Sequence, residues 1–188
     1  FMFGRKSRDN SAEETAQALY AALVQQSRKP AFYNRLGVAD SIDGRFDLLV
    51  VHAFLVLAAL KGEGDAARDV GTRLATAIFA GFEDALRDLG VGDMGMSRRI
   101  KAMADGFYGR LAAYDAATMD EALLAAVLLR NVYRGDHQHE GDASVLASYV
   151  MASRKAFSSA GGISTLLQGQ VVFSQLPEQP PIHTKLIV

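Results

Sequence analysis

The stretch VADSIDGRFDLLV places three aspartates and an arginine within eight residues, directly ahead of a long apolar run. A calcium loop of the EF-hand type needs oxygen ligands at alternate positions, and the alternate positions after Asp40 are Ile42 and Gly44. This excludes an EF-hand. A catalytic carboxylate pair needs surroundings that separate two pKa values, and nothing in the stretch demands them. Asp40, Ser41 and Asp43 instead suit the first turn of a helix, where they can accept hydrogen bonds from free backbone amides.

The segment KGEGDAA matches the pattern G-x-G-x-x-A of dinucleotide-binding turns, between an apolar run and an expected helix. Glu63 and Asp65, however, would place negative charge where a pyrophosphate must lie. The sequence that follows continues with helical periodicity and offers no second strand for a βαβ unit. We therefore interpret the segment as a tight turn between two helices and predict no nucleotide cofactor.

Two histidines and two carboxylates lie between Asp136 and Glu140, where together they could ligate zinc or another divalent cation. No cysteine and no second histidine cluster supports such a site, so we prefer an exposed polar loop. His52 stands alone on an apolar helical face, which indicates a core histidine bonded to a buried partner. A small metal-binding enzyme built on these residues is kept as an alternative hypothesis.

A charged stripe follows one face of a later helix, where Arg98, Lys101 and Asp105 recur at helical spacing. A solvated face is the ordinary explanation. Contact with an acidic partner or with anionic lipid headgroups is the alternative. No Ser/His/Asp or Cys/His arrangement and no P-loop is present, so we predict no catalytic residue, metal ion or cofactor.

Hydrophobic periodicity and capping signals predict an all-α protein. Six helices are expected, over residues 11–30, 43–61, 63–90, 97–114, 118–133 and 143–160. Ser11 with Glu14, and Thr118 with Glu121, form capping boxes that mark two of the starts. The second helix is apolar on nearly every face, so we expect it to be the buried centre of a bundle.

The expected organisation is a single helical domain over residues 11–162 and an extended, irregular tail over residues 163–188, with a strand-like piece at 170–173. The 188 residues suffice for one domain with a substantial core. A composition of 49% hydrophobic and 22% charged residues excludes a disordered chain. A net charge of −1 provides no basic field, so nucleic acid is not an expected partner.

Four glycines fall inside the expected third and fourth helices, where each costs about 1 kcal/mol relative to alanine. They are Gly71, Gly81, Gly106 and Gly109. Close approach of two helices is the ordinary reason for such glycines. The alternative is a shallow face left open for a helix of a partner protein, and the sequence alone does not distinguish the two.

Three segments of the chain together resemble the ubiquinol–cytochrome c chaperone family, whose mitochondrial members assist assembly of the cytochrome bc1 complex. The segments are FYNRLGVADSIDGRFDLLVVHAFLVLAAL, FEDALRDLGVGDMGMSRRIKAM and FYGRLAAYDAA, and the match covers roughly residues 12–160. In the first segment the matching positions are Tyr33, Gly37, Val38, Asp40, Asp43, Gly44, Arg45, Phe46, Asp47 and His52. In the later segments they are Gly90, Val91, Gly92, Asp93, Phe107, Tyr108, Gly109, Arg110 and Tyr114.

The resemblance implies an assembly chaperone that catalyses no reaction. Family members bind newly made cytochrome b, the haem-carrying membrane subunit, and keep it competent until haem and partner subunits join. Cytochrome b or another bc1 subunit is therefore the expected partner. Mitochondrial relatives carry a targeting presequence, which we do not find here. We accordingly expect a bacterial member in the cytoplasm, held peripherally at the cytoplasmic face of the inner membrane. A helical scaffold for another client protein is a further alternative.

For the contact with the partner we predict polar or amphipathic side chains at motif turns and helix edges, which core packing alone would not require. These residues are Asp40, Arg45, Asp47, Asp93, Arg98, Lys101, Tyr108 and Arg110.

Overall fold

The computed structural model describes residues 3–159 and 161–177, with side chains from Asn10 onward. These residues form helices and connecting segments without a β-strand, and the all-α prediction is confirmed. In chain order the helices are α1 (Phe3–Ser27), α2 (Pro30–Asn34), α3 (Ile42–Leu60), α4 (Asp65–Asp88), α5 (Asp93–Ala117), α6 (Glu121–Val132), the 3₁₀ helix η1 (His137–His139), α7 (Glu140–Phe157) and α8 (Gly162–Leu167). Among the described helices, none has both the length and the apolar character of a membrane span.

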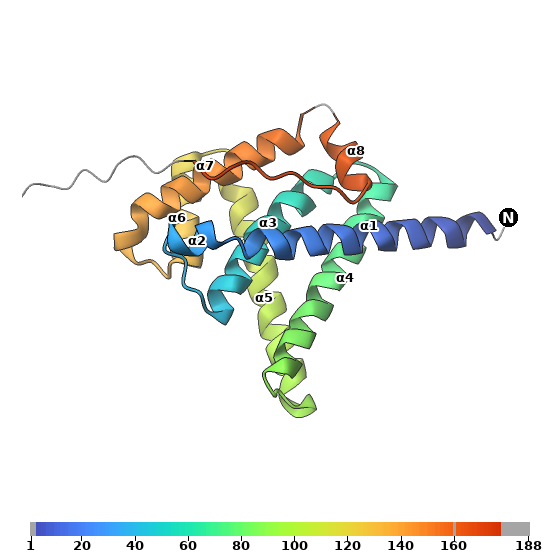
Figure 1. Ribbon diagram of the computed structural model, residues 1–188, viewed down its shortest axis with the longest axis horizontal. Helices are drawn as coiled ribbons and strands as arrows, with labels where there is room; N and C mark the ends of the chain where they lie inside the picture. The colour runs from blue at the N-terminus through green and yellow to red at the C-terminus, as the bar shows by residue number, and fades with distance from the viewer. Residues whose placement is uncertain (1–2, 160, 178–188) are drawn as a thin grey trace, which may run out of the picture.

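Helix α3 lies at the centre of the bundle, with α1, α4, α5 and α7 packed around it (Figure 1). Every side chain from residue 47 to residue 56 is buried, which confirms the expected central helix. Of the predicted caps, Ser41 accepts a hydrogen bond from the Gly44 amide at 3.1 Å. Residue 44 must be glycine because a Cβ there would lie 2.0 Å from the Ala39 carbonyl oxygen. The aspartate-rich stretch is thus the tight start of a buried helix.

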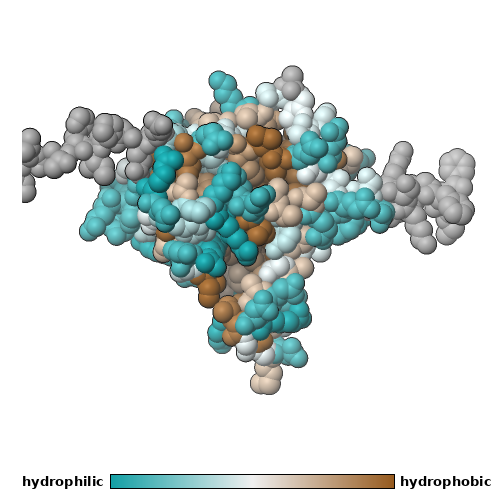
Figure 2. Space-filling view, viewed as in Figure 1, coloured by the Kyte–Doolittle hydropathy of each residue, from teal (hydrophilic) through white to brown (hydrophobic). Residues whose placement is uncertain are grey.

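Helices α4 and α5 form a long hairpin that projects from the rest of the bundle (Figure 1). Helix α1 packs along α4, and α6 packs along α7. Hydrophilic side chains cover most of the face seen in Figure 2, and apolar atoms are exposed in patches on the body and on the projecting end. Some side chains of the projecting hairpin are therefore exposed to solvent and do not pack in the core.

The first helix begins earlier than predicted. Helix α1 starts at Phe3, so that Ser11 and Glu14 lie inside it. The predicted capping box is wrong because the helix already runs through Ser11, and the Glu14 carboxylate accepts a hydrogen bond from the side chain of Asn10, at 2.6 Å, one turn back. Such a pair between residues i and i+4 stabilises a helix that continues through this point.

The second capping box is displaced by two residues. Thr118 ends α5, and its hydroxyl accepts a hydrogen bond from Arg154 at 2.7 Å. Asp120 is the N-cap of α6, where its carboxylate accepts a hydrogen bond from the Leu123 amide at 3.0 Å. Thr118 belongs to the end of α5, so the residue directly before α6 is Asp120, and its carboxylate supplies the cap.

Two further starts differ from prediction. Helix α5 begins at Asp93, four residues earlier than expected, because the turn after α4 is short and Gly90 closes it with a φ of 79°. Helix α7 begins at Glu140, so the segment predicted as a polar loop contains both η1 and the first turn of α7.

The segment after residue 161 differs from a fully extended tail, because residues 162–167 form helix α8. Residues 168–177 are extended and lie against the bundle: the Ser174 amide donates to Ser153 Oγ at 3.1 Å, and Arg35 donates to the Pro177 carbonyl at 2.7 Å. The piece predicted to be strand-like, residues 170–173, is not a β-strand: Phe173 packs on the core and Val172 is exposed, and no strand pairs with it in the described chain. Residues 178–188 of the expected tail lie outside the described residues.

His52 is the buried core histidine that the sequence indicates. Its Nδ1 lies 2.7 Å from the Leu48 carbonyl oxygen, and its Nε2 lies 2.9 Å from the hydroxyl of Tyr149. Because a carbonyl oxygen only accepts, Nδ1 donates and Nε2 accepts the tyrosine proton. The Tyr149 oxygen in turn accepts a hydrogen bond from Gln26 at 2.9 Å. Burial lowers the pKa of His52 to about 4, so the neutral imidazole links α1, α3 and α7.

A candidate partner-binding groove

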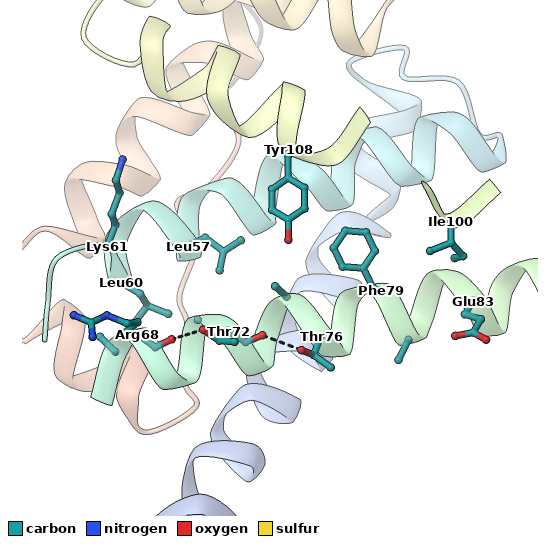
Figure 3. Close-up of a pocket in the computed structure, with 14 residues that line it drawn as sticks. Leu57, Leu60, Lys61, Arg68, Thr72, Thr76, Phe79, Glu83, Ile100 and Tyr108 are labelled. Atoms are coloured by element: carbon teal, nitrogen blue, oxygen red, sulfur yellow. Dashed lines mark hydrogen bonds between the residues drawn. The ribbon is translucent and has the colours of Figure 1, made fainter. Parts of the chain in front are cut away.

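A groove of about 720 Å³ runs between α3, α4 and α5 (Figure 3). It opens because α4 and α5 meet at the hairpin turn and diverge toward α3 (Figure 1). Helix α4 contributes most of the lining, and the C-terminal end of α3 and two residues of α5 complete it. The lining residues are Leu57, Leu60, Lys61, Ala67, Arg68, Gly71, Thr72, Ala75, Thr76, Phe79, Ala80, Glu83, Ile100 and Tyr108.

The α4 wall of the groove consists mainly of small residues and threonines. Gly71 and Ala75 lie one helical turn apart on this wall. Thr72 Oγ1 donates to the Arg68 carbonyl at 2.9 Å, and Thr76 Oγ1 donates to the Thr72 carbonyl at 3.1 Å (Figure 3). Because both hydroxyl protons are already bonded to the helix itself, the threonines contribute mainly apolar contact to a partner.

Tyr108 is the residue among the predicted contacts that lines this groove. Its side chain is 55% exposed and projects from α5 across the groove, between Leu57 and Phe79 (Figure 3). The Tyr108 ring centroid lies 5.9 Å from that of Phe79, which packs edge-on against Phe107 at 5.3 Å. A tyrosine held in this way offers a partner an apolar ring face and a hydroxyl.

The charged residues of the groove stand at its two ends. Lys61 and Arg68 lie near the turn between α3 and α4, and Glu83 lies toward the hairpin turn (Figure 3). Lys61 Nζ is 3.2 Å from Asp115 Oδ2, and Arg68 Nη1 is 3.0 Å from Asp65 Oδ1. Exposed pairs of this kind contribute at most about 1 kcal/mol, so a partner can replace them at little cost.

A second cavity, of about 330 Å³, shares Leu57 and Lys61 with the groove. It continues between α3 and α5, past Leu111 and Ala112, as far as Asp115. The apolar surface available to a partner therefore extends along α5 beyond Tyr108.

Two of the predicted contact residues form an exposed ion pair at the start of α3. Arg45 Nε lies 2.8 Å from Asp40 Oδ1, and both side chains are more than half exposed. They line a separate cavity of about 290 Å³ together with Arg28 and Tyr33. The Asp40–Arg45 pair is accessible to a partner but does not belong to the groove.

Asp47 and Arg110 are brought together in the interior. The Asp47 side chain is fully buried, with Oδ1 2.9 Å from Arg110 Nη2 and Oδ2 2.8 Å from Arg134 Nη1. Burial raises the pKa of the Asp47 carboxyl, and the two guanidinium groups partly offset this effect. The Arg110 guanidinium also lies over the Phe46 ring, at 5.3 Å from its centroid. These contacts place Asp47 in the core, where it ties α3 to α5 and to the end of α6.

The remaining predicted residues lie on α5 beyond the groove. Asp93 is in the first turn of α5, and Arg98 is exposed one turn later. Lys101 Nζ lies 3.1 Å from Asp105 Oδ2, and both side chains are at least 70% exposed. The structure therefore distributes the eight predicted residues over four places: the α3 start, the interior, the groove and the hairpin.

The α4 wall was missed by the prediction, although the glycines inside the helices pointed to it. Gly71 lines the groove, but a Cβ there would lie 3.8 Å from Leu57 Cδ2, so the residue also lies where α4 contacts α3. Gly81 agrees with close helix approach, because a Cβ there would lie 1.8 Å from the Tyr20 hydroxyl oxygen on α1. Gly109 meets nothing within 4 Å. Contact with a neighbouring helix thus accounts for Gly81 and in part for Gly71, and open space is found at Gly109.

The histidine-rich segment forms two separate pairs. His137 Nδ1 lies 2.5 Å from Glu140 Oε1, and His139 Nδ1 lies 2.7 Å from Asp142 Oδ2. His139 also stacks on Tyr133, with ring centroids 4.9 Å apart. Within residues 3–159 and 161–177, no three metal-ligating side chains converge.

Comparison with known proteins shows which family this chain is similar to. Residues 34–173 match the protein family described as Ubiquinol-cytochrome C chaperone, a span that includes every residue lining the groove. The crystal structure of the Cbp3 homolog from Brucella abortus superposes with a TM-score of 0.81 and 33% sequence identity, covering 93% of this chain and 96% of that one.

Curated relatives agree with this match. The chain is 22% identical over 165 residues to ubiquinol-cytochrome-c reductase complex assembly factor 1 of Xenopus laevis, covering 87% of this chain and 82% of that protein. It is 23% identical over 167 residues to the proteins of the same name from mouse and human, of which it spans 57% and 56%. The chain belongs to the ubiquinol–cytochrome c chaperone family.

Proposed function

We propose that this protein assists assembly of the ubiquinol–cytochrome c reductase (bc1) complex by binding newly made cytochrome b, and that it catalyses no reaction. The single observation that carries the proposal is the open groove between α3, α4 and α5. A chaperone for an integral membrane subunit must cover apolar helix surface that would otherwise be exposed to water. The family membership and the names of the relatives support the bc1 complex as the destination.

The charged residues outside the groove are proposed to set the register of the client. The Asp40–Arg45 pair at the start of α3 and the exposed Asp93, Arg98 and Lys101 on the hairpin form a polar surround. Polar rims of this kind contribute more to specificity and association rate than to affinity. Because the client is a membrane subunit, we place the encounter at the cytoplasmic face of the membrane, with the chaperone bound peripherally.

The proposal is tested by deleting the gene that encodes this protein and recording the absorbance spectrum of b-type haem in isolated membranes. We expect loss of most of the bc1 haem b signal and of ubiquinol–cytochrome c reductase activity, both restored by a plasmid copy. Unchanged bc1 content and activity in the deletion strain would show that the protein serves a different process. Crosslinking during synthesis should in addition recover cytochrome b bound to this protein.

A further inference from the structure

The charge layout of the groove indicates what kind of segment fits it. Between Arg68 at one end and Glu83 at the other, the lining residues of α4 are all uncharged. These two positions are fifteen residues apart on α4, which corresponds to about 22 Å at about 1.5 Å per residue. A partner segment that enters this space with a charge at its middle would lose solvation and find no counter-charge. Charges at the ends of the segment, by contrast, would meet Lys61, Arg68 or Glu83.

The walls of the groove favour a helix over an extended chain. An extended segment needs partners for its backbone N–H and C=O groups, and the α4 wall from residue 71 to residue 83 is helix interior, where these groups are bonded within the helix. The hydroxyl protons of Thr72 and Thr76 are used within α4 as well. A helix satisfies its own backbone and therefore enters such a groove without leaving polar groups unpaired.

The small residues on α4 decide how near such a helix can come. Gly71 and Ala75 lie one turn apart in the lining and add little side-chain bulk to the α4 wall; beside Gly71 the nearest atoms belong to Leu57 and Leu60 of α3. Small residues at this spacing allow two helix backbones to approach closely, which is how many helices associate inside membranes. Tyr108 and Phe79 on the opposite side supply aromatic surface against which the same helix can pack.

From these observations we propose that the groove holds one uncharged, membrane-type helix of about 15 residues, in contact with Gly71 and Ala75. This assignment rests on the proposed function, which identifies the client as a membrane subunit. It adds that the client is bound as a helix. The chaperone shields one transmembrane helix at a time, and the rest of the client stays outside the groove.

The absence of cysteine from the sequence allows a site-specific test. Purified Ala75→Cys protein is mixed with a synthetic helical peptide of leucine and alanine that carries glutamates at one end, lysines at the other and a single cysteine near its centre, and disulfide crosslinking between the two is measured. Ala126→Cys, an exposed position on α6, is the matched control, and Thr72→Cys serves as a second groove position should residue 75 disturb the fold. We expect crosslinks from the groove positions and none from residue 126.

A second peptide with one aspartate at its centre tests the charge argument. We expect its affinity to fall by at least about tenfold, because the carboxylate would be buried without a partner. Equal crosslinking at residues 75 and 126, no crosslink from either groove position, or equal affinity for the two peptides would overturn the assignment. If the deletion strain loses the bc1 complex but the groove positions give no crosslink, the proposed occupant of the groove is wrong and the bc1 role stands. If the groove positions crosslink the peptide but the deletion strain keeps a normal bc1 content, the bc1 role is wrong and the occupant stands.

Discussion

Asp47 of α3 and Arg110 of α5 form an ion pair across 2.9 Å, and the Asp47 side chain is inaccessible to solvent. Arg134 completes the arrangement from the end of α6, at 2.8 Å from the other carboxylate oxygen. Arg110 lies on α5 two residues beyond Tyr108, which lines the groove. The role of the ion pair is to hold the start of α3 and the middle of α5 in a fixed relation.

Replacement of Asp47 by alanine removes the counter-charge of Arg110, whose side chain is only 21% exposed, whereas Arg134 is half exposed and still lies 3.9 Å from Asp43. We expect Asp47→Ala to lower the free energy of unfolding by about 3 kcal/mol, measured by urea denaturation at pH 7. The matched control is Asp40→Ala, which removes the exposed partner of Arg45 and should cost less than about 1 kcal/mol. Losses of similar size at the two positions would contradict a structural role for the buried pair.

The buried His52 makes stability depend on pH. Its pKa is about 4 in the folded protein against an unfolded value of 6.5, so between these values the unfolded chain binds the additional proton. Stability is therefore lost as the pH falls from 6.5 toward 4. We expect a loss of about 2 kcal/mol from this residue between pH 7 and pH 5. Urea denaturation of His52→Gln should show a pH dependence smaller by that amount, and an identical dependence in both proteins would contradict the assignment.

Phe173 of the extended segment packs edge-on against the His52 ring, with ring centroids 5.0 Å apart. Its ring centroid lies 5.5 Å from that of Phe157. We expect Phe173→Ala to destabilise the protein by about 2 kcal/mol, less than for a fully buried phenylalanine. Water would then reach His52, so the depression of its pKa and the pH dependence of stability should both diminish. The neighbouring control Val172→Ala, 75% exposed, should change stability by less than about 0.5 kcal/mol. A Phe173→Ala protein with unaltered pH dependence would show that residues 168–177 do not shield the histidine.

Two helix glycines should respond in opposite ways to the same substitution. Gly109→Ala adds a methyl group where nothing lies within 4 Å, so the gain in helix propensity should stabilise the protein by about 1 kcal/mol. Gly81→Ala would press a methyl group against Tyr20, at 1.8 Å from its hydroxyl oxygen, and should destabilise by about 1–3 kcal/mol. Thermal unfolding followed by circular dichroism measures both. A stabilising Gly81→Ala would contradict the close packing of α1 on α4.

The central helix was predictable because its signal is local and strong: residues 48–60 are apolar except for His52, and Ser41 stands at the correct distance from the first turn. The capping boxes at Ser11 and Thr118 fit the local pattern equally well and were wrong. At each, the group that capping needs is bonded elsewhere: Asn10 binds the Glu14 carboxylate, and Arg154 of α7 binds the Thr118 hydroxyl. A local sequence pattern does not show which other residues will hydrogen-bond to the capping groups.

The candidate site was only partly predictable for a related reason. Tyr108 was identified because a polar aromatic residue on a helix edge is informative by itself. Asp47 was predicted to contact a partner, but Arg110 lies 63 residues farther along the chain, and only the fold brings the two together. The groove depends on how α4 and α5 diverge, which is a property of the tertiary arrangement. Of the four helix glycines that raised the possibility of an open face, Gly71 lies in the groove.

The claim that the groove serves bc1 assembly is tested most directly by filling it in cells. Thr76→Trp places a large side chain on the exposed α4 wall without entering the core, and Ala126→Trp on α6 is the matched control. Each variant is expressed in the deletion strain, its folding is checked by thermal unfolding, and haem b of the bc1 complex is measured by difference spectroscopy. We predict that Ala126→Trp restores the haem b signal and that Thr76→Trp leaves it near the level of the deletion strain. A folded Thr76→Trp protein that restores the full signal would contradict the account.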